Sequence, residues 1–314
     1  MIDFLQGDVF DNIKKLDDNS IDCVVTSPPY WGLRDYGVPG QLGLEPTYQE
    51  HIQNIVELFR AMKPKLKDSS TIWLNYGDSY AATVNGTKAK DIKNDDRKFV
   101  DKPFSTIQGS IKPKDLVMIP NRIAIALQND GWWIRSEIIW HKPNPMPEST
   151  KDRPTQCHEK IWLITKSKKY YYDADAIREP VAQGTITRLS EKNLKNQKGS
   201  TRGNGGMRSN GNMKPVGNME TKNKRNVWTI TTKPCKEAHF ATFPKDLIEP
   251  CIKAGCPENG IVFDPFGGSG TTGIVAKLLN RRSILSELNP EYIEIAKVRI
   301  NKEFGMFECN ILKR

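Results

Sequence analysis

The chain has 314 residues, of which 37% are hydrophobic, and is long enough for one large α/β domain with an inserted or appended module. A formal net charge of +10 and a sequence pI of about 9.2 favour a polyanionic partner. Nucleic acid is favoured over an anionic membrane. No stretch reaches the roughly 18 apolar residues of a membrane helix, and the first residues lack the pattern of a signal peptide. We therefore expect a cytoplasmic protein without membrane contact.

The six cysteines form no CxxC pair and are expected to be reduced thiols. Cys157, His158, Cys235 and His239 could be drawn as a zinc site, but their spacing is not typical of zinc ligands. The sequence therefore predicts no metal centre.

Apolar runs and helical patterns alternate along most of the chain. In chain order we expect a buried strand over 20–25, a helix over 47–63, a strand over 70–76, a helix over 115–130, strands over 134–141 and 160–167, a helix over 244–254, a strand, glycine turn and helix over 260–280, and a strand and helix over 281–304. This alternation predicts an α/β fold with a doubly wound, mostly parallel sheet.

Two segments interrupt the alternation. Residues 81–114 are polar and without a clear period, and residues 181–226 are rich in Gly, Asn and Lys. Between Arg188 and Arg225 there are ten Lys or Arg and only two Glu, so this segment carries most of the net charge. Its composition fits a disordered insert without a role, but its place between two parts of an α/β domain favours a module that orders on an anionic partner.

A glycine cluster near the C-terminus follows a predicted buried strand and precedes a helix. Glycine lets the backbone turn tightly and approach a ligand closely. The next strand ends in Glu287, twenty positions after Gly267, where nucleotide-binding α/β units place an acid that binds ribose hydroxyls. We interpret the region as a nucleoside-binding βαβ unit; the alternative is a turn whose glycines serve only packing.

Residues 26–31, Thr-Ser-Pro-Pro-Tyr-Trp, follow the first predicted strand. The two prolines cannot extend a strand, because neither has an N–H to donate. Sheets of this kind bind ligands outside the carboxyl ends of their strands, so this stretch and the glycine loop are expected at one crevice. Rigid acceptors beside aromatic rings suit a planar heterocycle with an exocyclic amino group.

Both segments match motifs of one family. Ser27 to Tyr30 match the pattern (D/N/S)-P-P-(Y/F/W), and residues 264–272 match a D-P-F-x-G-S-G-T-T loop. Residues 239–244, His-Phe-Ala-Thr-Phe-Pro, and the pair Gly7-Asp8 agree with the same family. The chain resembles the DNA amino-methyltransferases that use S-adenosylmethionine, and its motif order resembles the β-type permutation.

The resemblance implies a permuted Rossmann-like methyltransferase fold. Its catalytic half would span residues 1–180, with an insert at about 81–114, and its cofactor-binding half residues 235–314. A target-recognition region would span residues 181–234 between them.

The resemblance also implies roles for single residues. The catalytic set is Ser27, Pro28, Pro29 and Tyr30. The cofactor-binding set is Asp8, Thr242, Phe243, Pro244, Asp264, Pro265, Phe266, Gly268, Gly270, Thr271, Thr272 and Glu287. Candidate DNA contacts are Trp31, Lys142, Arg153, Arg202, Arg208, Lys224 and Arg225. For Lys142 and Arg153, an ordinary surface charge is an equally good interpretation.

The implied reaction is direct methyl transfer to an amino group of a base flipped out of double-stranded DNA, without a covalent enzyme–base adduct. Tyr30 would stack on the base, and Ser27 and the Pro28 carbonyl would accept hydrogen bonds from its amino group. In this family Ser at the first motif position goes mostly with cytosine N4, so we expect cytosine, with adenine N6 as the alternative. Methylation of RNA or protein amines, a non-catalytic nucleic-acid-binding protein, a companion restriction enzyme, and a monomeric or homodimeric state are left open.

Overall fold

The computed structural model describes residues 1–82, 105–190, 220–233, 243–305 and 309–311. The chain divides into two compact units. We call Met1–Tyr172 together with Asn226–Arg314 the core unit, and Asp173–Arg225 the insert unit.

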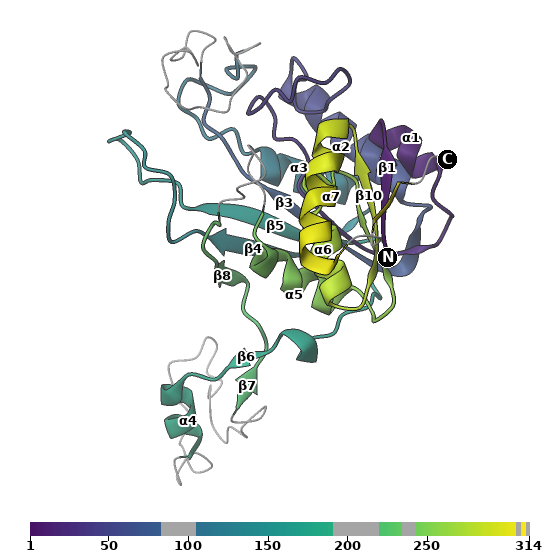
Figure 1. The fold of residues 1–314 in the computed structure, drawn as a ribbon. Helices are drawn as coiled ribbons and strands as arrows, with labels where there is room; N and C mark the ends of the chain where they lie inside the picture. Colours follow the sequence, from purple (N-terminus) through teal and green to yellow (C-terminus); the bar gives the residue numbers. More distant parts are fainter. Residues whose placement is uncertain (83–104, 191–219, 234–242, 306–308, 312–314) are drawn as a thin grey trace. The chain divides into compact units, whose positions relative to one another are not determined.

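The core unit is built on a nine-stranded sheet with the strand order β11-β1-β10-β9-β2-β3-β5-β4-β8 (Figure 1). Its strands are β1 (Ile2–Gln6), β2 (Ile21–Thr26), β3 (Leu66–Tyr76), β4 (Trp133–His141), β5 (His158–Thr165), β8 (Val227–Thr229), β9 (Ile261–Asp264), β10 (Arg282–Glu287) and β11 (Cys309–Ile311). Neighbouring strands pair in parallel, except that β5 runs antiparallel to both β3 and β4. The predicted doubly wound, mostly parallel sheet is confirmed.

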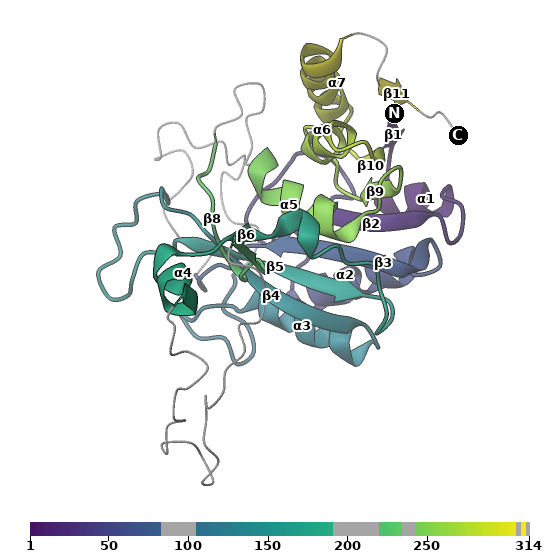
Figure 2. The same cartoon turned by 90° about the horizontal axis from the view of Figure 1, so that it is seen from below.

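Helices cover both faces of this sheet (Figure 2). They are α1 (Val9–Lys14), α2 (Tyr48–Met62), α3 (Ile119–Asn129), α5 (Lys245–Gly255), α6 (Thr271–Leu278) and α7 (Pro290–Phe304). The helices α1, α2 and α3 pack their apolar sides into one core cluster with β2 and β3, whereas α6 and α7 pack against β1 and β10 in another. The apolar stripe of α2 is buried at Ile55, Phe59 and Met62, as its helical spacing predicts.

The strand β1 was not predicted, and it joins the two ends of the chain. It lies between β10 and β11 and pairs in parallel with both. Residues 2–5 are buried, because β1 is an inner strand covered by helices. The chain's first strand therefore belongs structurally to the half of the sheet that carries the glycine loop.

Two helix boundaries differ from the prediction. The helix expected over 115–130 begins only at Ile119, because Met118 before it has a left-handed backbone conformation with φ of 63°. The residue Gly255 is the last residue of α5 and not a cap beyond it. A Cβ on Gly255 would lie 2.3 Å from Thr71 Oγ1 and 2.4 Å from Trp73 Nε1, so this glycine allows α5 to approach β3 closely.

The insert unit contains a two-stranded antiparallel sheet of β6 (Glu179–Pro180) and β7 (Thr221–Lys222), a 3-10 turn η2 (Asp175–Ile177), and α4 (Gln183–Ser190). Most of the predicted basic segment falls on residues 191–219, which lie outside the described residues. Within the described part of the chain, no helix is long and apolar enough to cross a membrane.

Candidate active site

A cavity of about 700 Å³ lies at the carboxyl ends of the parallel strands of the core unit. The residues that follow β1, β2, β9 and β10 all line it: Gly7 and Asp8, Ser27 to Tyr30, Pro265 to Ser269, and Leu288 and Asn289. Ligands bind at this edge of α/β sheets, because the loops there are free to diverge while the strands hold them in place. The structure therefore brings the proline motif and the glycine loop to one cavity.

The proline motif is held by contacts of Tyr30. Its ring stacks on Tyr76 with a centroid distance of 4.4 Å and an interplanar angle of 26°. Its hydroxyl donates to Glu159 Oε2 at 2.8 Å and lies 3.2 Å from Ser27 Oγ. Burial, and then the charge of Glu159, raise the pKa of Tyr30 well above its ordinary value, so the hydroxyl stays protonated.

Sequence reasoning missed two polar residues of the cavity, Glu159 and Asn75. The amide of Asn75 donates to Glu159 Oε2 at 3.1 Å, and Lys142 forms an ion pair with Glu159 Oε1. The only local signal was an acid and an amide next to apolar strand residues. The pairing of β5 with β3, which juxtaposes them, cannot be read from local sequence.

The predicted DNA contact Lys142 lines the cavity itself. Its ammonium lies 4.3 Å from the centroid of the Trp140 ring, and its side chain is only 19% exposed. The structure therefore argues against the alternative interpretation of Lys142 as an ordinary surface charge.

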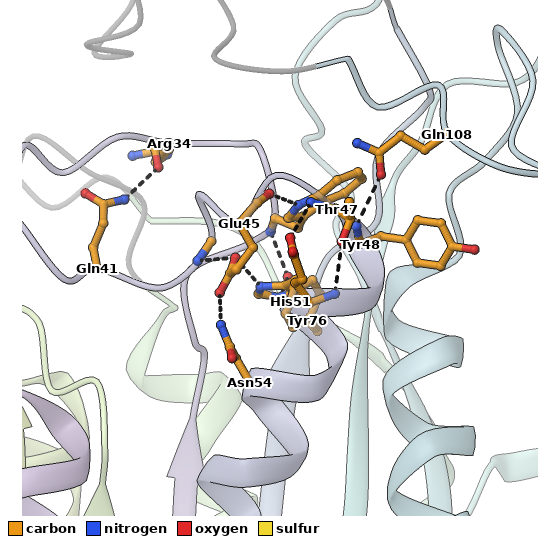
Figure 3. Close-up of polar contacts among 12 residues, drawn as sticks. Arg34, Gln41, Glu45, Thr47, Tyr48, His51, Asn54, Tyr76 and Gln108 are labelled. Atoms are coloured by element: carbon orange, nitrogen blue, oxygen red, sulfur yellow. Dashed lines mark hydrogen bonds and ion pairs between the residues drawn. The ribbon is translucent and has the colours of Figure 1, made fainter.

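A buried network of hydrogen bonds among Glu45, His51 and Tyr76 holds the backbone at the end of the proline motif (Figure 3). His51 Nδ1 lies 2.9 Å from a carboxylate oxygen of Glu45, and His51 Nε2 lies 2.7 Å from the Tyr76 hydroxyl. That hydroxyl accepts from the backbone N–H of Trp31 at 2.8 Å. In the tautomer whose Nδ1 donates to Glu45, Nε2 accepts from the Tyr76 hydroxyl, and every donor of this network then meets an acceptor.

The network also corrects the expectation for Trp31. Its side chain is 2% exposed, and its indole N–H donates to the Glu45 carbonyl at 2.8 Å. Trp31 is thus a core residue that anchors the motif and not a DNA contact.

The glycine loop is braced by Asp264. One carboxylate oxygen accepts from the Thr26 hydroxyl at 2.8 Å and from the Phe266 N–H at 3.1 Å, and the other accepts from the Thr272 hydroxyl at 2.6 Å. Burial raises the pKa of Asp264 to about 6. Thr272 is fully buried, which corrects the expectation of a direct cofactor contact: its hydroxyl holds Asp264 in place.

Glu287 ties the glycine loop to the end of β10. Its carboxylate accepts from the Gly268 N–H at 2.7 Å and from the Asn289 N–H at 2.8 Å. Burial raises the pKa of Glu287. The backbone of Gly268 has φ of 49°, and a Cβ on Gly267 would lie 2.8 Å from Leu285 Cβ. Gly268 is favoured by its left-handed backbone conformation, and Gly267 by the lack of space for a side chain.

The other predicted cofactor residues lie at different depths around the cavity. Asp8 lines it and caps α1 by accepting from the Phe10 N–H at 2.9 Å. Of the residues not yet placed, Pro265, Phe266, Thr271 and Phe243 also line the cavity, whereas Gly270 and Pro244 precede α6 and α5 without lining it. Thr242 lies outside the described residues.

Sequence reasoning also missed an aromatic pair beside Glu287. Tyr36 and Tyr292 both line the cavity, with ring centroids 6.2 Å apart in an edge-on arrangement. Burial raises the pKa of both, to about 12 for Tyr292. Together with a buried carboxylate and a glycine turn, this apolar wall fits an adenosyl group with ribose hydroxyls.

The remaining candidate DNA contacts lie away from this network. Arg153 pairs with Glu148 at 2.6 Å and lies 3.6 Å from the centroid of the Tyr80 ring. In the insert unit, Arg225 pairs with Glu179 at 2.7 Å, and Lys224 is its neighbour in sequence. Arg202 and Arg208 lie outside the described residues.

Comparison with known proteins identifies the family. Residues 21–298 match the DNA methylase family of N6 and N4 enzymes. The chain belongs to this family. It is 45% identical to the Type II methyltransferase M.SmaI of Serratia marcescens, over 94% of this chain and 89% of that protein. It is 44% identical to the Type II methyltransferase M.Cfr9I of Citrobacter freundii, over 95% and 87%. The resemblance seen in the sequence is thereby confirmed.

Two solved structures share the fold of this chain. The TTHA0409 protein of Thermus thermophilus, in complex with S-adenosyl-L-methionine, matches with a TM-score of 0.61 and 20% identity over the whole of both chains. PvuII DNA methyltransferase, a cytosine-N4-specific protein, matches with a TM-score of 0.60 and 20% identity over 94% of this chain and 85% of that chain. The predicted Rossmann-like methyltransferase fold is confirmed.

Proposed function

We propose that this DNA methylase transfers a methyl group from S-adenosylmethionine to the exocyclic amino group of cytosine in DNA. The observation that carries the proposal is the shared cavity, where Ser27 faces the same space as the glycine loop and Glu287. S-adenosylmethionine is the methyl donor of the family and supplies a methyl group on a positively charged sulfonium.

The residues of the glycine loop and β10 would hold the donor. Glu287 would accept from the ribose hydroxyls, and Tyr36 and Tyr292 would flank the adenine, because all three line the same part of the cavity. Asp264 would act indirectly by keeping the loop in shape.

The residues of the proline motif would hold the target base. Ser27 Oγ and the Pro28 carbonyl would accept from its amino group, which directs the nitrogen lone pair toward the methyl group. The base would stack on the face of Tyr30 opposite the one that contacts Tyr76. None of the cysteines Cys23, Cys157, Cys251 and Cys256 lines the cavity, which agrees with transfer to an amino nitrogen and not to a ring carbon through a cysteine adduct.

The preference for cytosine rests on Ser27. A serine at this motif position is typical of cytosine-N4 members, and a hydroxyl is a weaker acceptor than the carboxylate typical of adenine-N6 members. Binding of double-stranded DNA would involve the insert unit, which contains the basic residues 188–225.

The test is to incubate the protein with methyl-labelled S-adenosylmethionine and genomic DNA that carries no methylation, digest the DNA, and identify the nucleosides by mass spectrometry. We expect N4-methyldeoxycytidine. If 6-methyladenine is the sole product, the cytosine assignment is wrong, and if no DNA is labelled, the proposed activity is wrong. Competition with RNA in the same assay separates DNA from RNA as the substrate.

A further inference from the structure

The hydrogen bonds around Tyr30 have a direction. The hydroxyl of Tyr30 has one hydrogen, and two acceptors are in reach: Glu159 Oε2 at 2.8 Å and Asn75 Oδ1 at 3.4 Å. The shorter bond, to a carboxylate, takes the hydrogen. Tyr30 Oη is then an acceptor for the hydrogen of Ser27, 3.2 Å away, so the lone pairs of Ser27 are left for a donor in the cavity.

Glu159 fixes this direction, because its neighbours are donors. Its Oε2 also accepts from the Asn75 amide at 3.1 Å, and its Oε1 accepts from the Lys142 ammonium. The side chain is 17% exposed, yet it lines the cavity. Packing alone does not require a carboxylate with so little exposed surface to be joined to the serine of the motif by two successive hydrogen bonds.

We propose that Glu159 is the terminal acceptor of the proton that the target amino group loses during methylation, reached through Ser27 and Tyr30. The inference rests on the proposed function. The amino nitrogen forms a bond to the methyl group, while the bond from that methyl group to the donor sulfur breaks and its electron pair goes to sulfur, which becomes a neutral thioether. The nitrogen releases one hydrogen as a proton, and the electron pair of that N–H bond stays on nitrogen. Ser27 Oγ takes this proton and gives its own to Tyr30 Oη, and Tyr30 gives its own to Glu159, which becomes a neutral carboxylic acid. Glu159 then releases the proton to water at the cavity.

The first test is Glu159→Gln. The amide keeps the size of the side chain, but it cannot accept at both oxygens as the carboxylate does. We expect the single-turnover rate of methyl transfer to fall by about 100-fold or more, with unchanged affinity for the cofactor, since general-base assistance contributes about 10²–10⁴-fold. The matched control is Glu137→Gln, which removes an acid that pairs with Lys160 at 2.7 Å on the neighbouring strand and does not line the cavity. A wild-type rate for Glu159→Gln overturns the proposal.

The second test asks whether the residues act as one chain. Tyr30→Phe removes the middle hydroxyl and keeps the ring stacked on Tyr76. We expect it to cost about as much as Glu159→Gln, and the double variant to be no slower than either single one. A relay also predicts a solvent deuterium isotope effect on single turnover that is lost in both variants. Losses that multiply in the double variant, with the isotope effect retained, would assign Glu159 a structural role only.

The third test needs no cofactor or DNA. The charge of Glu159 is one cause of the raised pKa of Tyr30, so Glu159→Gln should lower that pKa. It can be followed by NMR of the protein labelled at the tyrosine Cζ, with the Tyr30 signal assigned by its loss in Tyr30→Phe. An unchanged Tyr30 titration means that the two groups are not coupled and overturns the inference. An inactive wild-type protein in the methylation assay would instead overturn the proposed function.

Discussion

Asp264 is a buried carboxyl group that holds the glycine loop in place through hydrogen bonds. It is 1% exposed and accepts three hydrogen bonds, from Thr26, Phe266 and Thr272. Burial outweighs these bonds and raises its pKa from 3.8 to about 6. A carboxyl group whose pKa is raised on folding stabilises the protein when it is protonated, and this contribution is lost as the pH rises through about 6.

We therefore predict a pH-dependent difference between the wild-type protein and Asp264→Asn. The wild type should lose about 1 kcal/mol of unfolding free energy relative to the variant between about pH 5 and about pH 7.5, because only the wild type must ionise a buried group. Urea unfolding at the two pH values measures this difference. A constant difference between the two proteins would show that Asp264 does not titrate in this range.

The conformation of Gly268 leads to a second prediction. Its φ of 49° is strained for a β-branched residue, and its N–H is the donor to Glu287. Gly268→Val should abolish detectable binding of S-adenosylmethionine in calorimetry while the protein stays folded. The control is Gly109→Val, at a glycine with φ of 56°, no atom within 4 Å of its added Cβ, and no place in the cavity. Normal binding by Gly268→Val would remove the glycine loop from the cofactor site.

Some of these residues were predictable and others were not. Ser27, Tyr30 and Glu287 belong to short motifs at strand ends, where sequence spacing alone fixes their positions. Glu159 reaches Tyr30 across 129 positions in the sequence, through an antiparallel strand that has no local signal. For Trp31 the residue type was misleading, because an aromatic side chain beside a ligand motif serves equally well to anchor the loop in the core.

At the scale of elements, the network of Figure 3 couples α2 and β3 to the loop after β2. His51 on α2 and Tyr76 on β3 meet there, and both are almost fully buried. Buried polar groups of this kind are costly when one partner is removed, since the others lose their bonds without regaining water.

We predict that Tyr76→Phe lowers the unfolding free energy by about 1–3 kcal/mol, because it removes the buried hydroxyl that bonds to His51 Nε2 and accepts from the Trp31 N–H. It should also reduce the rate of methyl transfer, since the motif loosens, with little change in cofactor affinity. Urea unfolding and single-turnover assays measure the two effects. The control Tyr172→Phe changes a tyrosine that is 42% exposed and should leave both unaltered. Equal stability of the two variants would contradict a structural role for the network.

The predicted elements were mostly correct where periodicity was long, as in α2 and α7, or where a glycine turn marked a boundary, as before α6. The sequence did not reveal β1, a short strand whose residues pair only with strands from the other end of the chain. Local propensity cannot report such a partner. The role of Gly255 depended in the same way on β3, which is distant in sequence.

At the scale of the whole molecule, most of the net positive charge lies outside the unit that carries the sheet and the cavity. The sheet and the cavity belong to the core unit, while residues 188–225 hold ten Lys or Arg and two Glu. We predict that replacing Asp173–Arg225 by a flexible Gly/Ser linker leaves cofactor binding intact. DNA binding should weaken strongly, and its dependence on salt should become shallower, because fewer phosphates are neutralised. Calorimetry with S-adenosylmethionine and DNA titrations at two salt concentrations test this, and unchanged DNA affinity would exclude a recognition role for the segment.

The position of β1 has a consequence for how the protein is made. The strand is synthesised well before its partners β10 and β11, because about 275 residues separate β1 from β10. A growing chain on the ribosome therefore holds β1 and the proline motif long before it can close the cavity edge of the sheet, where the Gly7 N–H donates to the Glu287 carbonyl at 2.9 Å. Contacts between residues so far apart in sequence form slowly. The cavity is therefore complete only once β10 has been synthesised, and a chain interrupted before that point holds the proline motif without the strand that positions Glu287.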